Sequence, residues 1–272
     1  MTRALTDIAC FLLDLDGTIY LGNQLLPGAD RFIDILNRQD RKFFFLTNNS
    51  SRDKLAYVKK LDRLGIPVAP EQVITSGEAT ALYLKAIQPG AKLFLLGTEA
   101  LAREFARQGF ALVQKTETPD YVVLGFDTTL TYQKLWDACD LVREGVEYIA
   151  THPDFNCPLE GGKYMPDAGA MAAFIEASTG RVPKVIGKPH REIVDAVLIR
   201  TQVPREATAM VGDRLFTDIA MARDAGLTGI LVLSGESTRQ DAETSQFRPH
   251  YIFSSVAELG EALLQGEKGE GR

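Results

Sequence analysis

Phe11-Leu12-Leu13-Asp14-Leu15-Asp16-Gly17-Thr18 is an apolar run that stops at two carboxylates, a glycine and a hydroxyl. A run of this length before turn residues predicts a buried strand with both acids at its carboxyl end, where ligands bind in open α/β sheets. Asp14 and Asp16 would point the same way, and the following turn would aim one main-chain carbonyl at a shared cation. An isolated Asp-x-Asp-Gly is equally compatible with a plain strand and turn, so the rest of the chain has to decide.

The composition indicates an ordinary soluble protein, and 272 residues allow one large domain or two smaller ones. The net charge is -6 and there is no cluster of Lys and Arg, which argues against nucleic acid as a partner. The three cysteines are widely spaced without a Cys-x-x-Cys pair, as expected in a reducing cytoplasm. No apolar stretch approaches the ~20 residues that span a bilayer, and Met1 to Asp7 is too polar to open a secretory signal. We therefore expect a cytoplasmic protein without a membrane partner.

Predicted strands and helices alternate along the whole chain, which is typical of parallel sheets. The strands expected after the first are residues 42–46, 72–75, 93–97, 121–125, 147–150, 184–187, 207–211 and 229–233. The helices expected are residues 29–38, 52–64, 77–87, 99–108, 131–144, 167–178, 191–201 and 217–225. Residues 152–166 carry three prolines and two adjacent glycines, so we expect a long loop there, a kind of segment that is often functional.

The pattern restarts near Ala91 and returns near residue 183, which indicates a second α/β module inserted into the first. We therefore predict an α/β fold with a doubly wound parallel-sheet, Rossmann-like core at residues 1–80 and 183–272. The inserted module, residues 81–182, would form a smaller α/β cap domain that acts as a lid.

Four polar clusters follow predicted strands, so we expect all four at the carboxyl edge of a sheet. They are Asp14 with Asp16; Thr47, Asn48 and Asn49; Lys188 in a Gly-Lys-Pro stretch; and Asp213 followed by Asp218. Phosphoryl transfer needs an oxygen nucleophile, a divalent cation, neutral and cationic groups for the phosphoryl oxygens, and a proton donor for the leaving group. The four clusters supply each of these.

The acids can be assigned roles by residue type. Mg²⁺ held by Asp14, Asp213 and the main-chain carbonyl of Asp16 would neutralise the repulsion between carboxylates and an anionic ester. Asp14 would attack in line to form an aspartyl phosphate, while Asp16 protonates the departing oxygen and later activates water.

The other polar residues would surround the phosphoryl group. Thr47 through its hydroxyl and Asn48 through its main-chain amide would each hold a phosphoryl oxygen, with Asn49 in the same cluster. Lys188 would supply a compact positive charge. Asp218 lies near a predicted helix start, where it either caps the helix or orders a metal-bound water, and the sequence leaves both interpretations open.

These clusters resemble the four successive motifs of the haloacid dehalogenase superfamily, in order and in predicted strand context. The matching stretches are Asp14-Leu15-Asp16-Gly17-Thr18, Leu46-Thr47-Asn48-Asn49-Ser50, Gly187-Lys188-Pro189, and Val211-Gly212-Asp213 with Asp218. The insertion between the second and third motifs is similar to the large α/β cap of that superfamily's second class. Within the superfamily, the chain is most similar to the NagD-like and para-nitrophenyl phosphatase family, which residues 231–235 and Phe247-Arg248-Pro249 also resemble.

This resemblance implies Mg²⁺-dependent hydrolysis of a small phosphorylated metabolite, a phosphate monoester. It carries the roles given above onto Asp14, Asp16, Thr47, Asn48, Lys188 and Asp213. Thr151-His152-Pro153-Asp154 resembles the cap segment that faces the active site in this family, which commonly has asparagine in place of His152, and it makes Asp154 a candidate substrate contact. Lids of this type can mediate dimers, so a homodimer through the cap is a further expectation.

Two alternatives use the same residues. A hydrolytic dehalogenase also employs an aspartate nucleophile but needs no metal, so Asp16 and Asp213 argue against it. A non-catalytic sensor of a phosphorylated metabolite would not need the intact pair of Asp14 and Asp16. No motif identifies the physiological ester, the extent of cap closure or the oligomeric state.

Overall fold

The computed structural model describes residues 4–270, which form two compact units. The first unit comprises the described residues of Met1–Thr47, Val58–Ile74 and Val197–Arg272, and the second comprises Asn48–Tyr57 and Thr75–Ala196. Each unit contains a parallel sheet whose strands alternate with helices along the chain, so the predicted α/β class with an inserted module is confirmed. The expected domain boundaries, after residues 80 and 182, stay a prediction.

The sheet of the first unit is organised around β1, Cys10–Leu13. Its six strands have the order β15-β14-β13-β1-β4-β5. The other five strands are β4 Lys42–Thr47, β5 Val73–Thr75, β13 Thr208–Gly212, β14 Thr228–Val232 and β15 Tyr251–Phe253. All side chains of β1 are fully buried, as expected for an apolar strand that is covered on both faces. The chain winds outward from β1 on both sides, which puts the topological switch point between β1 and β13.

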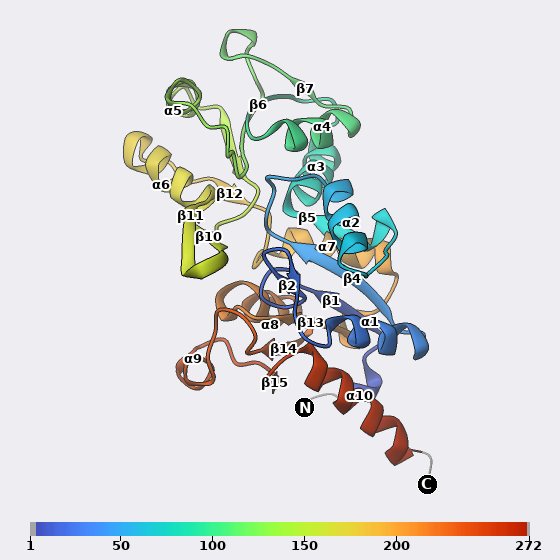
Figure 1. Cartoon of the computed structure of the whole chain (residues 1–272). Coiled ribbons are helices and arrows are strands. Elements are labelled where there is room, and N and C mark those ends of the chain that lie inside the picture. Colours follow the sequence, from blue (N-terminus) through green and yellow to red (C-terminus); the bar gives the residue numbers. More distant parts are fainter. Residues whose placement is uncertain (1–3, 271–272) are drawn as a thin grey trace. The chain divides into compact units, whose positions relative to one another are not determined.

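The helices of the first unit pack through apolar faces. They include α1 Ala29–Arg38, α8 Ala220–Ala225, α9 Arg239–Thr244 and α10 Val256–Glu270, while α2 Lys54–Arg63 and α7 Arg191–Thr201 each span a point where the chain passes between the units. Buried Phe32, Ile33, Ile35 and Leu36 recur on α1 at helical spacing. Figure 1 shows α1 in blue beside α10 in red, and the two helices are in contact.

The second unit has a parallel sheet of its own, with the strand order β12-β9-β8-β6-β7. These strands are β6 Lys92–Leu96, β7 Ala111–Leu112, β8 Tyr121–Leu124, β9 Glu147–Ala150 and β12 Lys184–Val185. The helices of this unit are α3 Ser76–Ile87, α4 Glu99–Arg107, α5 Tyr132–Arg143 and α6 Ala168–Thr179. Its core joins β6, β8 and β9 to α5 and α6 through residues such as Leu96, Leu124, Val142 and Ile175.

The expected long loop at residues 152–166 is wrong, because most of it forms a β-hairpin. Strands β10 Asn156–Leu159 and β11 Lys163–Pro166 pair antiparallel, and Gly161 and Gly162 make the turn with positive φ angles of 75° and 71°. A two-stranded ribbon consists of edge strands only, so its prolines cost fewer ladder hydrogen bonds than they would in a larger sheet. The prolines that suggested a loop are therefore compatible with this hairpin.

Smaller elements complete the structure. The hairpin of β2 Tyr20–Leu21 and β3 Gln24–Leu25 follows the acidic turn of the first unit. Short 3₁₀ turns lie at Leu5–Asp7, Pro70–Gln72, Lys115–Glu117, Glu160–Gly162 and Arg205–Ala207, and a π-helical turn, η6, lies at Leu215–Ile219.

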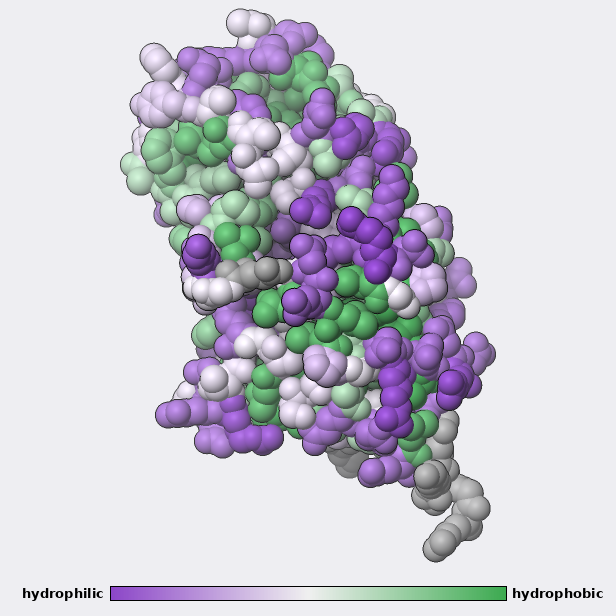
Figure 2. Space-filling view, in the orientation of Figure 1, coloured by the Kyte–Doolittle hydropathy of each residue, from purple (hydrophilic) through white to green (hydrophobic). Residues whose placement is uncertain are grey.

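The surface of the described residues carries both polar and apolar side chains. Hydrophilic and hydrophobic residues are interspersed on the face that Figure 2 shows. Between residues 4 and 270, no helix combines the length and the hydropathy that crossing a membrane requires.

Candidate active site

Three carboxylates gather at the switch point of the first unit's sheet. Leu13 at the end of β1 pairs with Val211 of β13, and the Asp14 amide donates to the Val211 carbonyl at 2.9 Å. Asp14 and Asp213 therefore leave neighbouring parallel strands at the same edge. One oxygen each of Asp14, Asp213 and Asp218 lies within 4.8 Å of the others, so this edge holds a compact acidic cluster.

Asp213 is buried in a tight backbone cradle. The Glu236 amide donates to its Oδ2 at 2.7 Å. A Cβ atom at Gly17 or at Gly235 would collide with the Asp213 carboxylate, and Gly17 also has a φ of 87° that favours glycine. These two positions thus need glycine because the backbone approaches a carboxylate closely.

The same carboxylate has an oxygen suited to a cation. Asp213 Oδ1 is buried and has no hydrogen-bond partner among the described residues. Burial, followed by the nearby charges of Asp14 and Asp218, raises the pKa of Asp213 well above its usual range. Clustered carboxylate oxygens are the ligands that Mg²⁺ prefers, and a cation would relieve both the repulsion and the unmet hydrogen-bonding capacity. The donor set therefore fits a magnesium ion.

Asp218 is fully buried beside the other acids. It lies in η6, and its Oδ2 accepts a hydrogen bond of 3.1 Å from the Arg214 amide at the start of that turn. A Cβ at Gly212 would collide with the Asp218 carboxyl group. Asp218 thus closes the turn while its carboxylate stays in the acidic cluster, so the cap and the metal-linked interpretations remain compatible.

Asp16 has surroundings that the sequence did not indicate. The Tyr20 hydroxyl donates to Asp16 Oδ2 at 3.3 Å, and the Lys60 ammonium lies 3.5 Å from the centroid of the Tyr20 ring. Burial raises the pKa of Asp16 to about 6, Lys60 opposes this, and the charge of Asp14 adds to it. A carboxyl group with a raised pKa is suited to carry a proton. No spacing rule marks Tyr20 or Lys60, because their relation to Asp16 arises only in the folded chain.

Thr47 and Asn48 lie on opposite sides of the division between the two units. Thr47 is the buried last residue of β4, next to β1, and belongs to the first unit. Asn48, the next residue, begins the second unit. The chain therefore passes from the first unit to the second within the predicted phosphate-binding segment.

The second unit brings Asn48, Asp154 and Lys188 together. The Lys188 amide donates to Asn48 Oδ1 at 2.8 Å, and Asn48 Nδ2 donates to the Lys188 carbonyl at 2.9 Å and to Asp154 Oδ2 at 2.9 Å. Asn48 is 7% exposed and Lys188 2%. Asn48 lies 106 positions from Asp154 and 140 from Lys188, so spacing alone did not predict the contacts.

Asn49 and His152 have their side chains engaged within the second unit. Asn49 Oδ1 accepts from the Ser51 amide at 3.0 Å, and its Nδ2 donates to Cys157 Sγ at 3.8 Å. His152 is fully buried, with Nε2 2.8 Å from Asp167 Oδ1 and Nδ1 2.8 Å from Thr151 Oγ1. His152 therefore fixes the segment that carries Asp154.

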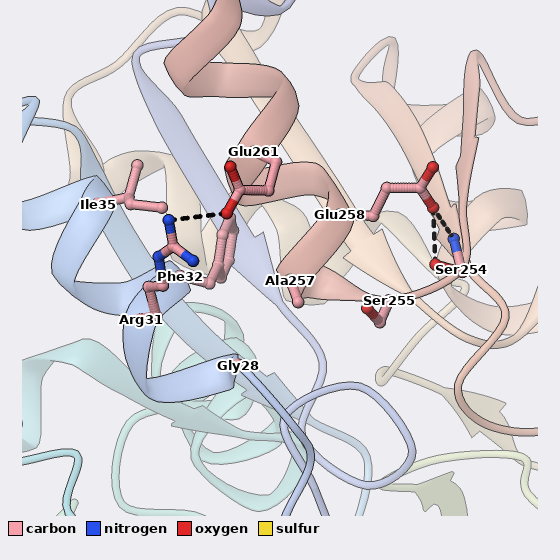
Figure 3. A pocket seen from close by; sticks show the side chains of 9 residues that line it. All are labelled: Gly28, Arg31, Phe32, Ile35, Ser254, Ser255, Ala257, Glu258 and Glu261. Atoms are coloured by element: carbon pink, nitrogen blue, oxygen red, sulfur yellow. Dashed lines mark hydrogen bonds and ion pairs between the residues drawn. The ribbon is translucent and has the colours of Figure 1, made fainter.

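A pocket of about 390 Å³ lies elsewhere on the first unit, between α1 and the start of α10. Figure 3 shows Phe32, Ile35 and Ala257 in it, with the Arg31–Glu261 ion pair on one side and the Ser254–Glu258 hydrogen bonds on the other. No candidate site residue lines this pocket.

Comparison with family models and curated proteins agrees with the motifs. A model of haloacid dehalogenase-like hydrolases matches residues 11–111, and a second HAD-hydrolase-like model matches residues 185–259. An acid sugar phosphatase of Staphylococcus aureus is 37% identical over 258 residues, which cover 95% of this chain and 98% of the relative.

Solved structures show the same similarity. The 4-nitrophenylphosphatase of Thermotoga maritima is 46% identical, with a TM-score of 0.91 over 95% of this chain and 98% of that one. NagD from Escherichia coli K-12 is 35% identical, with a TM-score of 0.85 over 92% of this chain and 98% of that one. Both similarities extend over the first and the second unit.

Proposed function

Because the chain belongs to the haloacid dehalogenase-like hydrolases, in the NagD-like and p-nitrophenyl phosphatase family, we propose a Mg²⁺-dependent enzyme that hydrolyses a small phosphate monoester through an aspartyl phosphate. The chain is a phosphoric monoester hydrolase. The proposal goes beyond this class in three respects, which are the metal, the nucleophile and the kind of ester. The observation that carries the proposal is the cluster of Asp14, Asp213 and Asp218 at the switch point, with Asp213 Oδ1 buried and lacking a hydrogen-bond partner within residues 4–270.

Asp14, Asp213 and the main-chain carbonyl of Asp16 would hold the metal, with Asp218 close to them. When bound, Mg²⁺ would supply positive charge that lets an anionic ester approach the carboxylates. The closely packed glycines around Asp213 support this role, because they keep its carboxylate in one position.

In the first step, an oxygen of Asp14 attacks phosphorus, and the bond from phosphorus to the ester oxygen breaks. Asp16 gives its proton to the departing oxygen, which leaves as an alcohol. The raised pKa of Asp16, about 6, supports its role as the acid.

In the second step, Asp16, now a carboxylate, takes a proton from water as the water oxygen attacks phosphorus. The bond between phosphorus and Asp14 breaks, so phosphate leaves and Asp14 is regenerated. Each residue ends the cycle in the protonation state in which it began.

Thr47, Asn48, Asn49 and Lys188 would bind the phosphoryl oxygens during both steps. The Thr47 hydroxyl and the Asn48 main-chain amide would donate hydrogen bonds, and the Lys188 ammonium would neutralise charge. Support comes from the chain itself, since Thr47 is the last residue of β4, the strand beside β1, and Asn48 contacts Lys188.

The substrate that we propose is a small phosphorylated metabolite, with sugar phosphates first among those to test. The 37% identity to an acid sugar phosphatase over nearly the whole chain supports this choice. We also propose that the enzyme works in the cytoplasm, where its three free thiols would stay reduced, and cell fractionation would check this location.

A homodimer through the second unit is a further part of the proposal. Tyr132 and Trp136 of α5 are 73% and 55% exposed, and Phe174 of α6 is also exposed beside them. Exposed aromatic residues in one patch are typical of interfaces. Light scattering during gel filtration should give twice the monomer mass, and Trp136→Glu should lower it, whereas a monomeric wild-type protein would contradict the dimer.

The proposed function is tested by a panel of phosphorylated sugars, nucleotides and cofactors, with Mg²⁺ and with a chelator. We expect phosphate release from at least one sugar phosphate and from 4-nitrophenyl phosphate, lost with the chelator and restored by excess Mg²⁺. Hydrolysis that is unchanged by the chelator would contradict the metal role.

A further inference from the structure

We propose that the Asn48 side chain is a positioning residue that locks Lys188 in place, and that Asp154 acts through Asn48 rather than by touching the ester. This inference rests on the proposed function, because it assumes that Lys188 binds a phosphoryl group. It assigns a task to the Asn48 carboxamide that is separate from the task proposed for its main-chain amide.

The Asn48 side chain forms hydrogen bonds with both main-chain polar groups of Lys188. Its Oδ1 accepts from the Lys188 amide at 2.8 Å, and its Nδ2 donates to the Lys188 carbonyl at 2.9 Å. Both groups are buried, so neither bond competes freely with water. Two bonds to the same residue fix both the position and the orientation of its backbone, and thus the root of the side chain that ends in the ammonium group.

Asp154 determines which way the Asn48 carboxamide faces. The second hydrogen of Asn48 Nδ2 is donated to Asp154 Oδ2 at 2.9 Å, a bond strengthened by the charge of the carboxylate. If the amide were flipped, its oxygen would face two acceptors, Asp154 Oδ2 and the Lys188 carbonyl, while its NH₂ group would face the Lys188 amide. Asp154 therefore favours the one orientation that holds Lys188.

The surrounding backbone leaves little space for another arrangement. A Cβ at Gly187 would lie 2.8 Å from Asn48 Oδ1, and the Gly187 amide donates to the Thr151 carbonyl at 2.8 Å. The Asp154 carbonyl accepts from the Gly169 amide at 2.8 Å, and the Ser76 hydroxyl donates to the Asn48 carbonyl. The backbones of Asn48, of Asp154 and of Gly187, which precedes Lys188, are thus each held by a hydrogen bond that does not involve the Asn48 side chain.

The central test replaces donors by acceptors without changing shape. Asn48→Asp keeps an oxygen for the Lys188 amide but loses both donations, so we expect kcat/KM with 4-nitrophenyl phosphate to fall about a hundredfold. Inhibition by inorganic phosphate should weaken about tenfold, because it reports the same pocket without chemistry. Asn37→Asp, on the exposed face of α1, is the matched control for the same chemical change.

A reciprocal exchange separates positioning from general damage to the fold. In the double variant Asn48→Asp with Asp154→Asn, the new amide at 154 donates to the new carboxylate at 48, which restores their bond. We expect about tenfold of the lost kcat/KM to return, together with tighter phosphate inhibition. A merely structural defect would worsen, because the two damaging changes would add.

Asp154 itself supplies the remaining comparison. Asp154→Asn keeps an acceptor for Asn48, whereas Asp154→Ala does not, so the alanine variant should lose at least threefold more kcat/KM than the asparagine variant. Equal losses would mean that the charge of Asp154 acts elsewhere, and would overturn the inference. If a thermal melt shows that Asn48→Asp does not fold, the comparison of Asp154→Asn with Asp154→Ala still tests the inference.

The outcomes distinguish the inference from the proposed function. A wild-type protein without phosphatase activity defeats the proposed function and, with it, the premise of the inference. An active wild type, with Asn48→Asp matching Asn37→Asp in kcat/KM and in phosphate inhibition, defeats the inference alone.

Discussion

Asp16 illustrates how single side chains divide the chemistry of the acidic cluster. Its Oδ2 accepts from the Tyr20 hydroxyl, whereas Asp213 Oδ2 accepts from a main-chain amide and keeps Oδ1 without a partner among the described residues. These surroundings suit the proposed division of roles, in which Asp16 carries a proton and Asp213 binds a cation. The roles proposed for Asp14, Asp16 and Asp213 come from their types and order in the sequence, whereas the groups that contact them became known only from the structure.

Tyr20→Phe should make the reaction depend more strongly on the leaving group. Without the Tyr20 hydroxyl, Asp16 is oriented less well for proton donation, which matters most when the departing alkoxide is a strong base. We expect kcat/KM for an alkyl phosphate to fall about tenfold, and that for 4-nitrophenyl phosphate clearly less. Steady-state rates for the two esters provide the measurement.

Tyr148→Phe is the matched control for Tyr20→Phe. The Tyr148 hydroxyl is buried in the core of the second unit and has no hydrogen-bond partner within the described part of the chain. Its removal should leave the ratio of the two rates unchanged. Equal losses for both esters in Tyr20→Phe would rule out a role in proton donation.

At the scale of elements, the strand ends organise the site. Most strands of the two parallel sheets and most helices were predictable because apolar runs and helical periodicity are local properties, and β9 and α7 have the predicted bounds. Strands β7 and β15 and helices α9 and α10 were not predicted. The β10–β11 hairpin was not, because a short ribbon with prolines looks like a loop in the sequence. Contacts between helices were not predictable from the sequence either. One of them involves a buried carboxyl group on α4.

That group, Glu104, is 4% exposed, and the Thr75 hydroxyl at the start of α3 donates to it at 3.2 Å. Burial, with the charge of Glu78, raises the pKa of Glu104 from 4.5 to about 7. Between these values the folded chain keeps a proton that the unfolded chain releases, so stability falls as pH rises from about 4.5 to about 7. The loss is on the order of 3 kcal/mol.

Glu104→Gln should remove this loss, because an amide cannot ionise and still offers an oxygen to Thr75. Urea unfolding at pH 5 and pH 7.5, followed by a probe in the second unit, should show a smaller decline than in wild type. Glu99→Gln, at an exposed position of the same helix, is the control and should decline as wild type does. An unchanged decline in Glu104→Gln would contradict the raised pKa.

At the scale of the whole molecule, the residues predicted for the site are divided between the two units. The first unit contributes Asp14, Asp16, Thr47, Asp213 and Asp218, and the second contributes Asn48, Asn49, Asp154 and Lys188. Their assignment to one site comes from the order of the sequence motifs, because most of them stand at or just after the end of an expected strand, and it stays a prediction. The hydrogen bonds between Asn48 and Lys188 were not predictable, because the two residues are 140 positions apart and meet only in the folded unit.

The central claim, that Asp14 is the nucleophile, is tested most directly by turnover of 4-nitrophenyl phosphate with Mg²⁺ by the Asp14→Asn variant. An amide is a far weaker nucleophile than a carboxylate, so kcat should fall at least about a thousandfold. Asp34→Asn, on the exposed face of α1, controls for the same change and should retain the wild-type rate. Phosphate release by Asp14→Asn at the wild-type rate would contradict the covalent mechanism.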